Sequence, residues 1–133
     1  MGKARARAKA QVTLDAGALI AIDRGDRRMI ALVEEVLDSG GRFQVPVGAL
    51  SQAWRNGQTQ AKLARFVRGA EVQMVPLDEA LARACGELLA ATGTSDVIDA
   101  SVVIVARQHH ALICTSDVAD LKALDKRAVL VRV

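Results

Sequence analysis

The sequence predicts a single α/β domain with a mostly parallel sheet and helices on both faces. Short apolar or β-branched runs alternate with amphipathic stretches from residue 12 to the end of the chain, and this alternation is typical of such sheets. The length of 133 residues suits one domain. A hydrophobic content of 51% with only 2% aromatics means that aliphatic side chains must build the core.

Five short strands are expected from runs of β-branched and apolar residues. They cover residues 12–14, 43–45, 72–75, 112–114 and 129–133. Pro46 closes the second strand and Pro76 follows the third. The run 112–114 is entirely apolar, which indicates a strand that is buried on both faces.

Seven helical stretches are expected between the strands, because apolar residues recur there at helical spacing. They cover residues 17–22, 29–37, 49–54, 61–67, 78–89, 95–106 and 117–124. Asp78 and Ser95 are the expected N-terminal caps of the fifth and sixth helices. Gly25 and Gly93 break or end helices, and His109-His110 indicates a C-terminal cap or a surface feature.

The charge is concentrated at the N-terminus. The chain carries 18 basic and 15 acidic residues, and removing Lys3, Arg5, Arg7 and Lys9 leaves 14 basic residues and a net charge of −1. Residues 1–10 therefore form a basic N-terminal extension, and residues 11–133 form the domain. A basic extension can contact phosphates, or it can be a disordered segment that aids solubility.

Neither a membrane span nor a metal-binding cysteine motif is expected. No apolar run reaches the length of a transmembrane helix, and no apolar signal-peptide core follows the basic N-terminus, so we expect a cytoplasmic location. Cys85 and Cys114 lie far apart without a CxxC or Cys/His spacing. They are expected to be reduced thiols in the core.

Five aspartates are expected at the carboxyl edge of the sheet, where parallel sheets bind ligands. Asp15 ends the first strand, Asp117 follows the strand 112–114, and Asp96 and Asp99 lie in the first turn of a helix at i, i+3 spacing, as do Asp117 and Asp120. Each of these aspartates alone is consistent with an ordinary helix cap. Together they repel one another unless a cation lies among them, and Mg²⁺ or Mn²⁺ suits carboxylate ligands.

Several segments resemble the PIN domains of VapC-type toxins from bacterial toxin–antitoxin pairs. The segments are Thr13–Ala16, Val45–Val47, Gln52–Arg55, Asp96–Ala100 with Ala106, and Thr115–Leu121. The resemblance implies a three-layer α/β/α domain that cuts RNA with Mg²⁺ or Mn²⁺, leaving a 3′-hydroxyl and a 5′-phosphate. It also implies a homodimer that is inhibited by a cognate antitoxin protein.

The resemblance assigns roles to individual positions. Asp15, Asp99 and Asp117 match the central catalytic acids, Asp96 and Asp120 match accessory acidic metal ligands, and Thr115 matches the hydroxyl that orients the loop of Asp117. The chain departs from the pattern at Gln52, where the family usually has Glu. An amide oxygen can ligate a metal or hold its water, but it adds no charge and cannot act as a base.

Two arginines are candidates for RNA binding. Arg24 belongs to a group with Arg27 and Arg28 around a turn near Asp15, and Arg55 follows Trp54, which could stack a base. A solvated loop and a packing role for Trp54 are the plainer interpretations.

Two alternative functions remain. An attenuated PIN domain would bind RNA or a protein without cutting, and Gln52 supports this reading. A phosphoacceptor receiver domain also gathers aspartates at a sheet edge, but it needs an acidic pair near the first strand, where Leu14 precedes Asp15.

Overall fold

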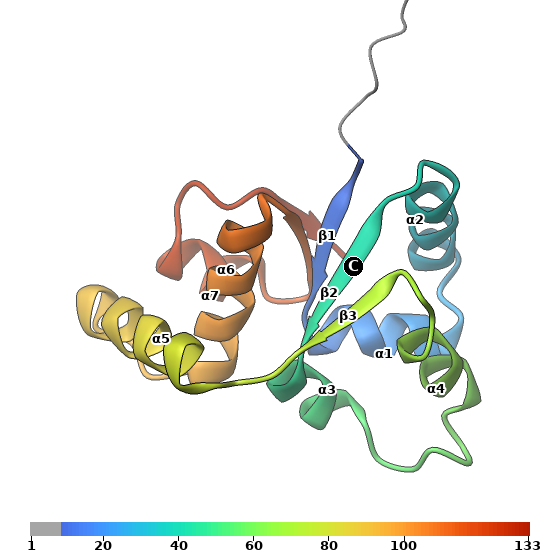
Figure 1. Ribbon diagram of the computed structural model, residues 1–133, viewed down its shortest axis with the longest axis horizontal. Helices are drawn as coiled ribbons and strands as arrows, with labels where there is room; N and C mark the ends of the chain where they lie inside the picture. Colours follow the sequence, from blue (N-terminus) through green and yellow to red (C-terminus); the bar gives the residue numbers. More distant parts are fainter. Residues whose placement is uncertain (1–8) are drawn as a thin grey trace, which may run out of the picture.

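A central parallel sheet organises the chain. The computed structural model describes residues 9–133, so Lys3, Arg5 and Arg7 of the expected extension lie outside the described residues. All strand pairs are parallel, in the order β3-β2-β1-β4-β5 (Figure 1). The strands are β1 (Gln11–Leu14), β2 (Arg42–Pro46), β3 (Val72–Val75), β4 (Leu112–Thr115) and β5 (Leu130–Arg132).

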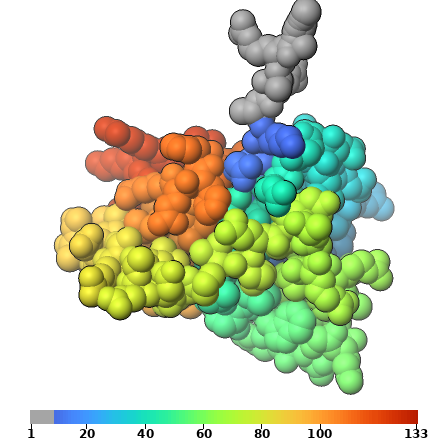
Figure 2. Space-filling model, viewed as in Figure 1, coloured from blue at the N-terminus to red at the C-terminus, as the bar shows by residue number. Residues whose placement is uncertain are grey.

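Seven helices in the described residues cover the sheet. They are α1 (Ala16–Arg24), α2 (Arg27–Asp38), α3 (Val47–Ala53), α4 (Ala61–Val67), α5 (Glu79–Thr92), α6 (Val97–His109) and α7 (Val118–Leu124). Helices α1, α2 and α4 lie on one side of the sheet and α5, α6 and α7 on the other (Figure 1). The predicted three-layer α/β/α architecture with a parallel sheet is confirmed. The loop between α3 and α4 protrudes from the surface, in green in Figure 2.

The core is aliphatic, as the composition predicts. Val12 and Leu14 of β1 and Phe43 and Val45 of β2 are fully buried, because strands covered on both sides have no solvent face. Phe43 makes an edge-to-face contact with Phe66 of α4, at 5.2 Å between ring centroids. The predicted state of Cys85 and Cys114 is also confirmed, since both are buried free thiols.

Several helix boundaries differ from the prediction. Helix α1 is longer than the predicted turn at 17–22, and Gly25 ends it with a positive φ of 69°, a conformation that glycine adopts without strain. Helix α2 begins at Arg27, capped by Asp26. Arg27 and Arg28 therefore lie in the first turn of a helix, and with Arg24 they flank the turn at Gly25 and Asp26, as predicted.

The cap of α6 is Asp96 and not Ser95. Oδ1 of Asp96 accepts a hydrogen bond from the backbone N–H of Asp99 at 2.9 Å. A cap binds the N–H two or three positions further on, and Asp96 stands at that spacing from the first free N–H groups of α6.

None of the helices in residues 9–133 is, on its own, long and apolar enough to cross a membrane. Only α5 and α6 taken together pass a test of length and composition, and the pair is bent by 109°.

Candidate functional site

Asp15 lies immediately after β1, at the carboxyl edge of the sheet. Only 6% of its surface is exposed, and its Oδ1 accepts a hydrogen bond from the N–H of Ala18 at 2.9 Å, which caps α1. Burial raises the pKa of the Asp15 carboxyl and the charge of Asp117 adds to this, while hydrogen bonds, first among them that of Thr115, act in the opposite direction. Asp15 is therefore both a helix cap and a buried acid beside a second acid.

Asp117 lies two residues beyond the end of β4, the strand that pairs with β1. Its backbone N–H donates to Oγ1 of Thr115 at 2.8 Å. The same hydroxyl hydrogen-bonds the Asp15 carboxyl, and a hydroxyl can accept one bond while it donates another. Asp117 occupies the N-cap position of α7, but within residues 9–133 its side chain makes no capping hydrogen bond to this helix. Capping therefore explains Asp15 and does not explain Asp117.

The loop that carries Asp117 packs against the first turn of α1 at Gly17. A Cβ atom on residue 17 would lie 2.1 Å from Oγ and 2.6 Å from Cβ of Ser116. Only glycine permits this approach, so Gly17 brings the segments after β1 and β4 together. The sequence patterns did not indicate this role for Gly17. Its signal is a glycine inside a helical pattern, two residues after the candidate acid.

Asp99 lies in the first turn of α6 and is half-buried. Its pKa is raised from 3.8 to about 6, first by burial and then by the charges of four aspartates. These are Asp96, Asp120, Asp117 and Asp15, in decreasing order of effect. The four other aspartates named from the sequence thus act on the Asp99 carboxyl from three separate segments of the chain.

The i, i+3 spacing predicts that Asp96 and Asp99 present two carboxylates on one helix face. In the structure only Asp99 is within the helix, and Asp96 is its N-cap. Asp96 stands before the helix, and its side chain is bonded to the backbone of Asp99. That bond satisfies an N–H at the start of the helix. Asp96 is exposed and contributes charge to the site as well as a helix cap.

The fold is shared with solved toxin structures. The VapBC2 complex from Rickettsia felis, bound to a DNA fragment from its promoter, has a TM-score of 0.67 at 17% identity over 92% of this chain and 98% of that chain. A toxin–antitoxin complex from Klebsiella pneumoniae has a TM-score of 0.67 at 13% identity over 90% and 95%. VapC20 from Mycobacterium tuberculosis, a toxin that cleaves the sarcin–ricin loop, has 0.58 at 15% over 79% and 87%.

This chain has the PIN-domain fold. The predicted fold resemblance is thereby confirmed. No family model matches the sequence, and no curated protein matches it. The agreement is one of architecture.

Gln52 lies in the last turn of α3 in this PIN fold, and its surface is exposed. Gly48, one helical turn earlier, faces Ile98 at the start of α6, since a Cβ on residue 48 would lie 3.0 Å from Cγ1 of Ile98. Residues four apart share a helix face, so Gln52 is on the side of α3 that faces the start of α6. Its role at the site stays a prediction.

Of the two candidate RNA-binding arginines, Arg24 lies away from Asp15, and the guanidinium of Arg55 is hydrogen-bonded to backbone carbonyls. Arg24 is the last residue of α1, so about 13 Å of helix separates it from Asp15. Nη1 of Arg55 donates to the carbonyls of Ser51 and Trp54, at 3.2 and 2.7 Å. Both arginines are exposed, and RNA binding by either stays a prediction.

The donor set of this PIN domain fits a hard divalent cation. The acidic side chains offer carboxylate oxygens, and the causes of the raised pKa of Asp99 include no cationic side chain. Within residues 9–133, however, no three acidic, histidine or cysteine side chains stand close enough together to count as a metal-binding group. Carboxylates gathered at one edge repel one another, and a cation among them would offset that repulsion.

Proposed function

We propose that this chain is a Mg²⁺- or Mn²⁺-dependent endoribonuclease and the toxin of a toxin–antitoxin pair. One observation carries the proposal. Burial, and after it the charges of four other aspartates, raises the pKa of the half-buried Asp99 carboxyl to about 6, at the ligand-binding edge of a fold shared with VapC toxins. A concentration of like charge costs stability, and a site for a cation is a physical reason to retain it.

Asp15, Asp99 and Asp117 are the residues we assign to hold the cation, with Asp96 and Asp120 adding negative charge. Thr115 fixes the backbone of Asp117 through the bond at 2.8 Å, and Gly17 allows the two loops to meet. Asp96 anchors the first turn of α6 on which Asp99 stands. These contacts position the carboxylates before any cation binds.

A divalent cation bound here would supply a water of lowered pKa and a counter-charge for the phosphodiester. The chain itself contributes the carboxylates and their positioning. Neither histidine is close enough to act as a proton donor, because His109 and His110 lie at the far end of α6, about 15 Å of helix from Asp99. We therefore assign protonation of the leaving oxygen to solvent.

The proposed partners are an RNA substrate, a cognate antitoxin protein and a second copy of the chain. The antitoxin is supported by the neighbours, among them VapBC2, a Klebsiella pneumoniae toxin–antitoxin complex and FitAB bound to a DNA fragment. The test is the mass of the purified chain in solution, alone and with the product of the adjacent gene. A monomer that is unaffected by that product contradicts both proposals.

Cleavage of labelled single-stranded RNA tests the activity. We expect cleavage with Mn²⁺ or Mg²⁺, none with EDTA, and a loss of at least about a hundredfold in Asp99→Asn and Asp117→Asn, as is common for groups that stabilise charge in a transition state. Asp38→Asn is the matched control, because Asp38 is an exposed acid at the end of α2. Equal activity in all three variants would contradict the assignment.

A second candidate function is a non-cleaving PIN domain that binds RNA or a protein. It is favoured by one observation, the exposed neutral amide of Gln52 on the side of α3 that faces α6. Under this reading the wild-type chain binds RNA in EDTA and leaves it intact with Mn²⁺. The cleavage assay separates the two functions directly.

A further inference from the structure

A cavity lies at the amino edge of the sheet, opposite the aspartates. Its volume is about 910 Å³, and it opens between the starts of β1 and β4, the C-terminal half of α6 and the loop from α7 to β5. We call it the amino-edge groove. Its apolar floor includes Val103, Ala106, Leu112 and Leu124, and its rim carries Lys9, Arg107, Lys126 and Arg127.

The amino-edge groove is strongly basic in a domain without excess charge. Its lining has four basic side chains against one acidic side chain, Asp125. Residues 9–133 carry 15 basic and 15 acidic residues, because Lys3, Arg5 and Arg7 precede them. The positive charge is therefore separated from the negative charge along the strands, with the aspartates at the opposite edge.

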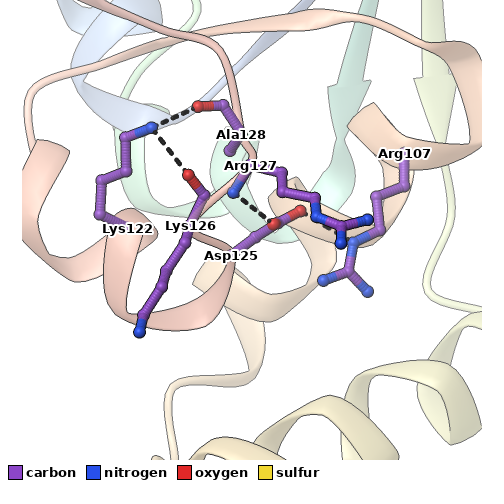
Figure 3. A network of polar contacts seen from close by, with 6 residues as sticks. All are labelled: Arg107, Lys122, Asp125, Lys126, Arg127 and Ala128. Atoms are coloured by element: carbon purple, nitrogen blue, oxygen red, sulfur yellow. Dashed lines mark hydrogen bonds and ion pairs between the residues drawn. The ribbon is translucent and has the colours of Figure 1, made fainter.

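The single acid in the groove is already engaged. Oδ2 of Asp125 accepts from Nε of Arg107 at 2.9 Å, and Oδ1 accepts from the backbone N–H of Arg127 at 2.9 Å. Figure 3 shows the guanidinium groups of Arg107 and Arg127 beside this carboxylate, and both charges lower the pKa of Asp125. One carboxylate faces two guanidinium groups, so an excess of positive charge remains.

The loop that carries these charges is fixed by hydrogen bonds. Nζ of Lys122 donates to the carbonyls of Lys126 and Ala128, at 3.3 and 2.6 Å (Figure 3). Together with the bonds of Asp125, these contacts restrain the backbone of residues 125–128. The side chain of Lys126 points away from this network (Figure 3) and is exposed. A preorganised cationic rim binds an anion with a smaller loss of conformational entropy than a mobile loop does.

We propose that the amino-edge groove binds the phosphate backbone of RNA, at a place distinct from the acidic edge. This inference rests on the proposed ribonuclease function. The lining contains no Phe, Tyr or Trp side chain, and His110 is its one aromatic ring, so we assign recognition mainly to charge rather than to sequence. The four residues of β1 separate the groove from Asp15 by about 13 Å. A long RNA can therefore contact both edges, and the groove would hold the strand outside the cleavage point.

The test compares two double variants of the full chain that lose the same charge. Lys126→Gln/Arg127→Gln changes the groove, and Arg65→Gln/Arg68→Gln changes two exposed arginines at the end of α4, on the other side of the sheet. Affinity for labelled single-stranded RNA is measured against salt concentration in EDTA, where metal-supported cleavage is absent. Melting curves of all three proteins confirm that each is folded.

For the groove variant we expect the slope of log K against log salt to be less steep by about 1.4, because two phosphate contacts are lost at roughly 0.7 each. If the proteins converge at about 1 M salt, this is a weakening of about 25-fold at about 0.1 M. The α4 variant should show a smaller change in the salt slope and a smaller loss of affinity. Equal effects in both variants would overturn the proposal, since they would reflect bulk charge.

Other outcomes also decide the proposal. If the groove variant retains RNA affinity and loses the adjacent-gene protein, the groove is a protein interface and the proposal is wrong. RNA binding in EDTA that depends on Lys126 and Arg127, without cleavage in Mn²⁺, refutes only the ribonuclease function. If the wild type cleaves RNA and the groove variant binds RNA as tightly as the wild type does, only the proposed role of the groove is refuted.

Discussion

Gly17 and Ser116 lie in direct contact, so the first turn of α1 touches the loop that carries Asp117. A Cβ on residue 17 would be 2.1 Å from Oγ, 2.6 Å from Cβ and 3.2 Å from the backbone nitrogen of Ser116. A rotation of the serine hydroxyl relieves the first of these distances, but the second requires the backbone to move. The positions of Asp15 and Asp117 therefore depend on the absence of a side chain at residue 17.

Gly17→Ala is expected to lower both stability and RNA cleavage. Overpacking of a close contact costs about 1–3 kcal/mol, and displacement of the loop moves Asp117 relative to Asp15. Gly86→Ala is the matched control, because Gly86 is also helical and a Cβ there meets nothing within 4 Å. That control should gain roughly 0.5–1 kcal/mol from helix propensity. Urea unfolding and the cleavage assay measure both effects, and similar behaviour of the two variants contradicts the role of Gly17.

Removal of the Thr115 hydroxyl is expected to loosen both acids. Thr115→Val leaves the backbone N–H of Asp117 without its acceptor at 2.8 Å and removes a hydrogen bond from Asp15. The loss of a partner by a buried polar group costs about 1–3 kcal/mol. Thr115→Ser retains the hydroxyl and should recover most of the cleavage rate. Cleavage by Thr115→Val at the wild-type rate would show that the site does not need the hydroxyl.

Stability of the metal-free protein should depend on the ionisation of Asp99. Its pKa is raised from 3.8 to about 6 in the folded state, so folding favours the protonated carboxyl. This contribution to the free energy of unfolding is fully present below pH 3.8 and is lost as the pH rises through about 6. Asp99→Asn lacks it, so its stability relative to the parent should rise across that window. Asp15 shifts in the same direction but is present in both proteins. Urea unfolding in EDTA at several pH values measures the difference, which a flat profile would contradict.

Mn²⁺ or Mg²⁺ should stabilise the folded protein, and Asp99→Asn should abolish the effect. Ligand binding to the folded state adds about 2.7 kcal/mol at a hundredfold excess over Kd. In EDTA the Asn variant should melt no lower than the parent, because one repelling charge is absent. Asp38→Asn serves as the control for a lost surface acid and should keep the full metal shift. Equal metal-induced shifts in Tm for the Asp99 variant and the parent would refute the role of Asp99.

The sequence predicted the elements and the acidic edge because those features depend on local patterns. Strand and helix periodicity is local. Parallel strands bring their carboxyl ends to one edge of the sheet, whatever the positions of the connecting helices. The contact of Gly17 with Ser116 and the groove between Lys9 and residues 125–128 join distant segments, so no local pattern contains them. The cap of α6 was misjudged by one residue because Ser95 and Asp96 are both good caps, and only the path of the chain selects between them.

Gln52 is the position where this chain departs from the pattern it resembles. The side chain is exposed and neutral in the last turn of α3, on the side of the helix where Gly48 meets Ile98. Glutamate has the same length as glutamine, so Gln52→Glu adds a charge with little change in volume. The added carboxylate would attract a cation at the acidic edge and would repel the aspartates there when no cation is bound.

Gln52→Glu is therefore expected to bind Mn²⁺ more tightly than the wild type, to cleave RNA faster, and to be less stable in EDTA. A unit charge pair at about 4 Å contributes on the order of 4 kcal/mol at an effective dielectric of about 20, before the cost of desolvation. Gln73→Glu makes the same change at an exposed position on β3 and should alter none of the three quantities. Titration of Mn²⁺ into each protein, followed by the cleavage assay with labelled RNA, measures all of them. Unchanged affinity and unchanged cleavage in Gln52→Glu would mean that residue 52 does not face the acidic edge, and that the resemblance of Gln52–Arg55 to the toxin segment does not extend to its chemistry.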